Sequence, residues 1–378
     1  MTDDVVPFTV AVSDNEITDL HRRLDATRWP DQIPDTGWDY GADLSYVQSL
    51  CDTWRNDFDW RSAEAKINAF DNFTTTIDGA NVHLIHARSP EPGALPLLLT
   101  HGWPGSIAEF LDVIGPLRDP VAHGGDAADA FHVIVPSLPG YGFSGPTIEP
   151  GWDVQRVAAA WKTLMGRLGY DRYGAQGGDW GAMVTMRLAK IDADHLEGIH
   201  LNMALCGPAE GDLTEQEQAD LIEIGEFMTR GTAYQEIQGK NPQTLGYGVT
   251  DSPAGLAGWI AEKFWAWTDN DGSPDDAITR DQQLTNLSIY WFTKTINSSF
   301  RLYCESQRSG QFGPVDQRID VPTGVAVFPK EIFRLPEVWA RGGFDLRRYS
   351  RFDRGGHFAA FEEPDLFVED VRAFFRDL

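Results

Sequence analysis

The chain has 378 residues, of which 42% are hydrophobic, enough to form one large core or two domains. Its 57 acidic residues outnumber the 31 Lys and Arg residues. The resulting net charge of -26 repels phosphate backbones and anionic lipid, which argues against nucleic-acid and membrane-surface partners. The cysteines are odd in number and widely spaced, so we expect neither a disulfide framework nor a zinc site: Cys51, Cys206 and Cys304.

Targeting and membrane segments are not evident in the sequence. The N-terminus lacks a basic region followed by an apolar run, which predicts that there is no signal peptide. No apolar stretch approaches the ~20 residues that a membrane span needs. We therefore expect a soluble, cytoplasmic protein, and we expect no metal and no cofactor.

The first 70 residues predict helices that carry no obvious chemistry. A capping box at residues 13–16 precedes apolar residues at helical spacing, so a helix opens the chain and is expected to end at residues 29–31. Apolar residues mark a second helical face within the Trp- and Tyr-rich segment 36–70: Leu44, Val47, Leu50 and Trp54. We interpret residues 1–70 as a strap or lid that packs on the rest of the chain.

Strand signals begin after residue 70. Residues 73–77 and 82–86 alternate like strands, and Asp78-Gly79 between them is a strong hairpin signal. Three further apolar runs have the composition of buried strands and are separated by helical patterns: residues 95–100, 131–136 and 198–202. A hairpin followed by strands that alternate with helices predicts an α/β fold whose sheet is parallel over most of its width.

The alternation stops between about residues 206 and 312. This region has helical periodicity and many Trp and Tyr residues, so we interpret it as a helical cap over the carboxyl edge of the sheet, where open α/β folds bind ligands. A strand at 322–328 resumes the pattern, and an amphipathic helix at 366–378 ends it. The predicted division is a strap, a first core part, a cap and a second core part: residues 1–70, 71–205, 206–312 and 313–378.

The segment 173–181 carries the strongest chemical signal. A short apolar run leads into Gly-Gly-Asp-Trp-Gly at 177–181, and residues 182–188 follow as a helix. Small-x-Asp-x-small between a strand and a helix is typical of a nucleophile elbow, a sharp turn that raises one side chain above the sheet. The alternative interpretation is a Gly-rich turn with a solvated Asp. As an elbow, the segment makes Asp179 the nucleophile.

Residues after the elbow complete a triad in the order nucleophile, acid, base. Glu331 lies just beyond the last predicted strand, and His357 lies in a Gly-Gly-His loop before the final helix. Asp353 is an alternative acid, although it is very close to the histidine in the chain. The backbone amides of Trp103 and Trp180 are expected to form an oxyanion hole.

An Asp nucleophile narrows the reaction class. A carboxylate with a pKa of about 3.9 is already ionised at neutral pH, but it is a poor nucleophile toward esters and amides. It suits displacement at a saturated carbon, such as an epoxide or a carbon–halogen bond, and would form an alkyl ester on Asp179. His357, oriented by Glu331, would then activate a water that hydrolyses this ester.

The leaving group distinguishes the two kinds of substrate. An epoxide oxygen leaves as an alkoxide and needs a proton, which a Tyr hydroxyl with a pKa of about 10 can donate at neutral pH. The cap offers four tyrosines, and their spacing alone does not choose among them: Tyr234, Tyr247, Tyr290 and Tyr303.

The sequence resembles the microsomal-type epoxide hydrolases of the α/β-hydrolase superfamily along nearly its full length. The matching motifs are Arg-Trp-Pro-Asp at 28–31, Thr-Ile-Asp-Gly at 76–79, His-Gly-Trp-Pro-Gly-Ser at 101–106, Gly-Gly-Asp-Trp-Gly at 177–181, Asp-Ser-Pro-Ala-Gly-Leu at 251–256 and Gly-Gly-His-Phe-Ala-Ala-Phe-Glu at 355–362. The resemblance implies that Asp179 is the nucleophile, Glu331 the acid and His357 the base. It further implies that Tyr234 and Tyr303 bind the epoxide and that the N-terminal segment is the family's strap.

The resemblance also implies the partners of the protein. A small-molecule epoxide and water would be the substrates, and an epoxide from a natural-product pathway is one such substrate. The hydrophobic N-terminal anchor of the vertebrate members has no counterpart here, which favours a soluble enzyme of bacterial type with no membrane partner. The oligomeric state, a homodimer included, is left open.

Two other functions remain as alternatives. A haloalkane dehalogenase also uses Asp followed by Trp at the elbow, with the Trp holding the halide, but the paired cap tyrosines favour an epoxide. The second alternative is a degenerate hydrolase fold that is used for binding. The absence of one triad residue from the sequence would favour it. Incubation with styrene oxide and with a chloroalkane separates the three functions, which would give diol, halide or neither.

Overall fold

The fold is built on one nine-stranded sheet in the computed structural model, which describes residues 4–378. The spatial order of the strands within these residues is β1-β2-β3-β5-β4-β6-β7-β8-β9. Their bounds are Val6–Phe8 for β1, Asn72–Ile77 for β2, Ala80–Ala87 for β3, Leu95–Thr100 for β4, Phe131–Pro136 for β5, Tyr173–Gly177 for β6, Leu196–Leu201 for β7, Ile319–Val327 for β8 and Phe344–Arg351 for β9.

The sheet is antiparallel at one edge and parallel across the rest. The pairs β1–β2, β2–β3 and β3–β5 are antiparallel, whereas every pair from β5 through β4, β6, β7 and β8 to β9 is parallel. Leu97, Leu98 and Leu99 of β4 have no exposed surface. Strands that are buried on both faces are apolar throughout, which explains the unbroken apolar runs in the sequence. The predicted α/β fold with a mostly parallel sheet is confirmed.

Helices from the core segments cover the sheet. Their bounds are Leu111–Arg118 for α4, Val154–Arg167 for α5, Asp179–Ile191 for α6, Glu337–Gly343 for α13, Ala359–Glu362 for α14 and Pro364–Arg376 for α15. Short 3-10 helices lie at Ile107–Phe110 (η1), Val121–His123 (η2), Ala127–Asp129 (η3), Gly142–Ser144 (η4), Ala193–His195 (η5) and Pro274–Asp276 (η6). The Phe374 ring of α15 packs so closely on the sheet that a Cβ added at Gly198 or Gly324 would come within 2.9 or 2.8 Å of it. Glycine is therefore needed at both strand positions.

The N-terminal helices are α1 (Asp14–Asp25), α2 (Leu44–Asn56) and α3 (Trp60–Asn68). The Ser13 side chain caps α1 by accepting the Glu16 amide, as the predicted capping box requires. The helix ends at Asp25, however, and not at residues 29–31. The Ala26 amide closes the last turn on the Arg22 carbonyl, so the chain leaves the helix well before Pro30, which would disfavour a helical residue at 29.

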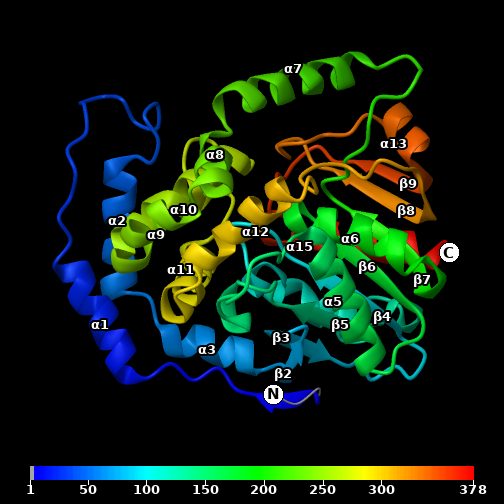
Figure 1. Cartoon of the computed structure of the whole chain (residues 1–378), viewed down its shortest axis with the longest axis horizontal. Coiled ribbons are helices and arrows are strands. Elements are labelled where there is room, and N and C mark those ends of the chain that lie inside the picture. Colours follow the sequence, from blue (N-terminus) through cyan, green and yellow to red (C-terminus); the bar gives the residue numbers. More distant parts are fainter. Residues whose placement is uncertain (1–3) are drawn as a thin grey trace.

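The cap helices lie between β7 and β8 in the chain. Their bounds are Glu215–Arg230 for α7, Ala233–Lys240 for α8, Pro242–Asp251 for α9, Pro253–Trp267 for α10, Arg280–Thr293 for α11 and Ile296–Arg308 for α12. Figure 1 shows helices α8 to α12 between the blue helices α1 and α2 and the sheet. Trp54 of α2 donates to Ser288 of α11 at 2.9 Å, and Trp38 stacks on Trp265 of α10 with ring centroids 5.0 Å apart. The domain boundaries stay a prediction.

None of the helices within residues 4–378 combines the length and the apolar composition that crossing a bilayer requires.

Candidate active site

The predicted elbow forms where β6 meets α6. Asp179 is the first residue of α6 and has a φ of +50°, in the left-handed region that residues with a side chain rarely adopt. A Cβ added at Gly177 would lie 2.2 Å from the Gly181 carbonyl oxygen, and one added at Gly181 would lie 1.9 Å from the Thr100 carbonyl oxygen. Only glycine fits at either position, because any side chain would overlap backbone atoms.

The two carboxylate oxygens of Asp179 face different groups. Oδ1 accepts the backbone N–H of Trp103 at 2.7 Å, and Oδ2 lies 3.5 Å from Nε2 of His357. The Asp179 side chain is 13% exposed. Trp180, the second residue of α6, presents one of the N–H groups that have no partner within a helix. The Trp103 amide has the distance expected of a donor in an oxyanion hole.

The structure brings Glu331 and His357 to the same place. Nδ1 of His357 lies 2.7 Å from Oε1 of Glu331, and the Ile332 amide donates to the same oxygen at 2.6 Å. Glu331 has no exposed surface and His357 is 5% exposed. A carboxylate on Nδ1 fixes the tautomer of the ring and directs Nε2 toward Asp179. The alternative acid, Asp353, is 93% exposed and is not part of this cluster.

Backbone hydrogen bonds tie the loop of His357 to the acid loop and to the cap. The Lys330 amide donates to the Gly355 carbonyl at 3.1 Å. The amide of His357 donates to the carbonyl of Trp267, the last residue of α10, at 2.9 Å. The Gly355 amide donates to the Asp269 carboxylate at 2.9 Å. The end of α10 therefore holds the histidine loop over the elbow.

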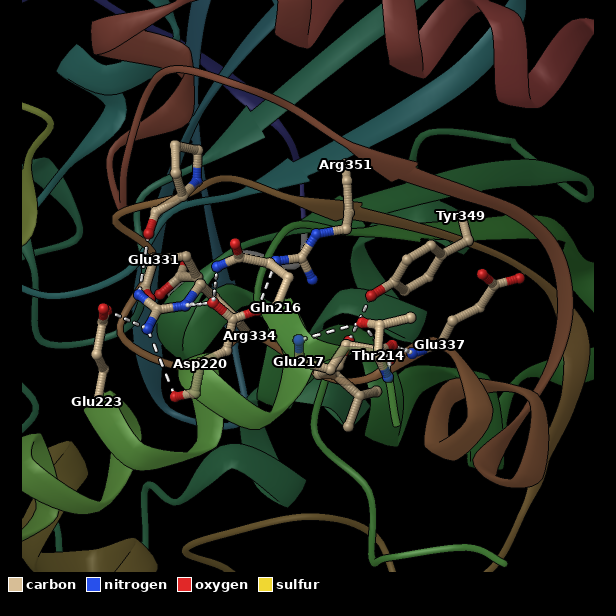
Figure 2. A network of polar contacts seen from close by, with 12 residues as sticks. Thr214, Gln216, Glu217, Asp220, Glu223, Glu331, Arg334, Glu337, Tyr349 and Arg351 are labelled. Atoms are coloured by element: carbon tan, nitrogen blue, oxygen red, sulfur yellow. Dashed lines mark hydrogen bonds and ion pairs between the residues drawn. The ribbon is translucent and has the colours of Figure 1, made fainter. Parts of the chain in front are cut away.

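Arg334 holds the loop that carries Glu331. Its guanidinium donates to the carbonyl oxygens of Pro329 and Glu331, each at 3.0 Å, and Arg334 is only 5% exposed. It also forms ion pairs with Asp220 at 3.1 Å and with Glu223 at 2.6 Å, both on α7. Figure 2 shows Arg334 between that helix and the acid loop. The cap helix α7 is thereby connected to the carboxylate that orients His357.

The charges of the site control the pKa of His357. Burial disfavours the imidazolium, but the charge of Glu331 and the hydrogen bonds to Asp179 and Glu331 outweigh burial and hold the pKa well above its usual value. The free site is therefore an imidazolium between two carboxylates. Loss of the charge on Asp179 would remove one of the groups that raise this pKa and would allow the imidazole to act as a base.

Two of the four cap tyrosines lie beside the elbow. Tyr234 of α8 and Tyr303 of α12 are 3% and 2% exposed. The Trp103 ring stacks on Tyr234 at 5.3 Å and meets the edge of Tyr303 at 5.8 Å. Burial raises the pKa of both tyrosines, and the charge of Asp179 raises it further. Both hydroxyls therefore stay protonated and can donate hydrogen bonds.

The other two tyrosines have different surroundings. Tyr247 is 74% exposed. Tyr290 is buried, but its hydroxyl already donates to the Gly105 carbonyl at 2.7 Å. The structure thus separates Tyr234 and Tyr303 from the other two tyrosines, a choice that their spacing in the sequence leaves open.

A cavity of about 10 Å³ lies beside Asp179 and His357, and Glu109 of η1 lines it as well. The sequence patterns do not single out Glu109, because an acid in a turn is ordinarily solvated. The signal that could have identified it is its position inside the apolar run 107–111, directly after the motif at 101–106.

Within residues 4–378, no group of three or more His, Cys, Asp or Glu side chains is arranged to hold a metal ion. Cys51, Cys206 and Cys304 are free thiols.

Comparison with known proteins assigns the family. The model of the epoxide hydrolase N terminus matches residues 5–110, and that of the alpha/beta hydrolase fold matches residues 96–238. A Stigmatella aurantiaca protein assigned to the epoxide hydrolases is 50% identical over 99% of this chain and 85% of its own. Epoxide hydrolase 1 of Sus scrofa is 38% identical over 98% of this chain and 88% of its own.

Solved structures of similar fold indicate the same family. The crystal structure of juvenile hormone epoxide hydrolase from the silkworm Bombyx mori superposes with a TM-score of 0.89 at 32% identity, covering 100% of this chain and 96% of that chain. Because these similarities extend over almost the whole chain, the protein belongs to the epoxide hydrolases of the α/β-hydrolase fold, enzymes that add water to an epoxide ring.

Proposed function

We propose that the protein converts an epoxide and water to a vicinal diol through a covalent ester on Asp179. The observation that carries this proposal is the placement of one carboxylate between a backbone donor and a base. Its Oδ1 lies 2.7 Å from the Trp103 amide, and its Oδ2 lies 3.5 Å from Nε2 of His357. Tyr234 and Tyr303 pack on the Trp103 ring from the cap.

In the first step, an oxygen of Asp179 forms a bond to a ring carbon while the bond between that carbon and the ring oxygen breaks. The ring oxygen takes a proton from Tyr234 or Tyr303. Burial raises the pKa of both tyrosines, so a hydroxyl is available to donate. Donors aimed at the oxygen where negative charge develops lower the barrier most.

In the second step, a water oxygen adds to Cγ of the ester, and the water gives one proton to Nε2 of His357. The amides of Trp103 and Trp180 stabilise the oxyanion. The bond from Cγ to the alkyl oxygen then breaks, and the imidazolium returns its proton to the diol. Asp179 retains an oxygen from water as a carboxylic acid, and its ionisation releases the proton that restores the tyrosine. His357 can act as the base here because the uncharged ester no longer raises its pKa: the imidazolium of the free site releases its proton to solvent before the water adds, and His357 takes a proton back from solvent once Asp179 is ionised again.

The tyrosine pair supports an epoxide over a haloalkane. A halide leaves as a stable anion and needs no proton, whereas an alkoxide does. The complete arrangement of Asp179, His357 and Glu331 supports a catalytic role over a binding role. The cytoplasm is the proposed location, on the basis of the sequence, and a natural-product epoxide is the proposed substrate, on the basis of the family resemblance.

The intact mass of His357→Gln after exposure to styrene oxide tests the covalent step. Ring opening needs no base, so this variant should gain and keep the mass of one styrene oxide. Asp179→Asn, the matched control, should gain none, and the wild type should release diol and return to its own mass. Diol release by His357→Gln without any mass gain, or halide release from a chloroalkane by the wild type, would refute the proposal.

A further inference from the structure

The cavity beside the elbow has the size of one water molecule. Its volume is about 10 Å³, and a buried water requires roughly 10–15 Å³. A water also needs two to four polar partners to occupy such a site. The cavity lining can supply them, because it includes four residues with polar side chains: Glu109, Asp179, Asn202 and His357.

Asn202 presents donors to this cavity. It is 6% exposed, and its Oδ1 accepts the side-chain amide of Gln176 at 2.7 Å. With that oxygen engaged, the remaining polar group of Asn202 is its NH₂, which can only donate.

Glu109 is held against the loop that carries Trp103. Its carboxyl lies directly on Gly105, where an added Cβ would be 1.4 Å from Oε1. Burial raises the pKa of Glu109 to about 8, while the charge of His357 lowers it and that of Asp179 raises it. The carboxyl is therefore close enough to both reactive groups to respond to their charges.

Glu362 provides a contrast. It is a second half-buried acid near His357, and desolvation also raises its pKa to about 8. Its two oxygens accept the amides of Asp269 at 2.8 Å and Phe358 at 2.9 Å, so it has a structural task in holding the histidine loop. Glu109 lines the cavity and Glu362 does not.

We propose that Glu109 positions the hydrolytic water in this cavity, a role that rests on the ester mechanism proposed above. His357 accepts one water proton at Nε2, and the Glu109 carboxyl accepts a hydrogen bond from the other. The NH₂ of Asn202 donates to one lone pair of the water. The second lone pair then points at Cγ of Asp179, so all four tetrahedral directions of the water are used.

The role of Glu109 is confined to the second step. The water oxygen forms the bond to Cγ and its proton goes to His357, so no proton is transferred to Glu109. Ring opening involves Asp179, the epoxide and a tyrosine, and it needs no water. The two steps should therefore respond differently to a change at residue 109.

Rapid-quench single turnover of Glu109→Gln with styrene oxide tests this separation, with the ester followed by intact mass. We expect ring opening at the wild-type rate and ester hydrolysis slowed about 2- to 10-fold, the range for weakening a hydrogen bond between neutral groups, because a pKa of about 8 leaves Glu109 largely protonated at neutral pH. Glu109→Ala, which removes the acceptor altogether, should slow the same step. Misfolded molecules lower the amplitude of a single turnover but leave the rate constant of the folded fraction intact.

Glu64→Gln is the matched control. Glu64 is 12% exposed and accepts the Val12 amide at 2.7 Å in the N-terminal segment, so both rate constants should stay at their wild-type values. Equal slowing of the two steps in the Glu109 variants, or unchanged ester hydrolysis in both, would overturn the role of Glu109. A failure of the ester mechanism itself has a different signature, because His357→Gln would then form no ester either.

Discussion

Tyr234 and Tyr303 are buried against Trp103, whereas Tyr247 is 74% exposed and Tyr290 uses its hydroxyl on a backbone carbonyl. The proposed division of roles follows from these surroundings. A buried phenol beside the elbow can donate to an alkoxide, a solvated phenol cannot reach it, and an engaged phenol would have to break an existing bond.

We therefore predict that Tyr234→Phe and Tyr303→Phe each slow ring opening. Each change removes one donor to the developing alkoxide, an effect of about 2–4 kcal/mol if it resembles the loss of an oxyanion-hole donor. The pre-steady-state rate of ester formation measures the rate of ring opening, and circular dichroism verifies that the variants are folded. Tyr247→Phe is the control and should open the ring at the wild-type rate. Wild-type ring opening in the double variant of Tyr234 and Tyr303 would remove both residues from the mechanism.

The sequence predicts some of these residues and not others. The order of Asp179, Glu331 and His357 along the chain is predictable, because strand ends and an elbow have recognisable patterns. The choice of tyrosines depends on which cap residues pack against the elbow, and the spacing of the tyrosines along the chain does not resolve this. Glu109 depends on the close approach of a loop to the elbow, and its one local signal is its position inside the apolar run 107–111.

Helix α7 contacts the core mainly through charged side chains. Its buried residues are Glu217 and Asp220. Asp220 pairs with Arg334 and also with Arg351 of β9. Because Arg334 also binds the carbonyl of Glu331, the same ion pairs support the acid loop (Figure 2). Breaking them should affect the second chemical step more than the first.

We predict that Asp220→Asn loosens both α7 and the acid loop. Removing one partner of a buried ion pair costs at most about 3–5 kcal/mol, and the cost here should lie below that range because Arg334 keeps Glu223 as a partner. Hydrogen exchange should accelerate in α7 and in residues 328–335, and ester hydrolysis should slow while ring opening persists. Glu226→Gln, an exposed change on the same helix, should leave exchange in residues 328–335 unchanged. Unaltered exchange there in Asp220→Asn would contradict the connection.

Strands and helices can be predicted from the sequence where burial of the element imposes a regular pattern of apolar residues. The central strands and the amphipathic α15 are recognisable because their apolar residues follow the period of the element. β1 and β9 are not among the predicted strands. β9 is an edge strand whose residues are mostly half-buried, and β1 has only three residues. Edge strands lack the apolar runs that identify a central strand.

The C-terminal helix α15 is bound to the sheet by one buried carboxylate. Asp370 of α15 accepts hydrogen bonds from His200 of β7 at 2.9 Å and from Arg348 and Ser350 of β9 at 2.6 Å each. Burial raises the pKa of Asp370, but these hydrogen bonds outweigh burial and lower it to about 2, from an ordinary 3.8. Three distant parts of the chain thus depend on the ionised form.

Asp370→Asn should therefore destabilise the whole fold in a pH-dependent way. A depressed pKa stabilises the native state above the ordinary value of 3.8, and this stabilisation is lost as the pH falls toward 2. At neutral pH the variant should lose about 2 kcal/mol of unfolding free energy, the equivalent of the shift from 3.8 to about 2, and the difference from the wild type should shrink over that acidic range. Urea unfolding at a series of pH values measures it, with the exposed Asp377→Asn as control. A difference that stays constant with pH would contradict this account.

A single turnover in heavy-oxygen water tests the central claim, that the epoxide is opened by Asp179 and not by water. With enzyme in excess over styrene oxide, the first diol should carry an unlabelled new oxygen, because that oxygen comes from Asp179. The carboxylate of Asp179 should become labelled, because water restores it during ester hydrolysis. Mass spectrometry of the diol and of the peptide containing Asp179 measures both. Labelled diol in the first turnover, together with an unlabelled Asp179, would mean direct attack by water and would contradict the account.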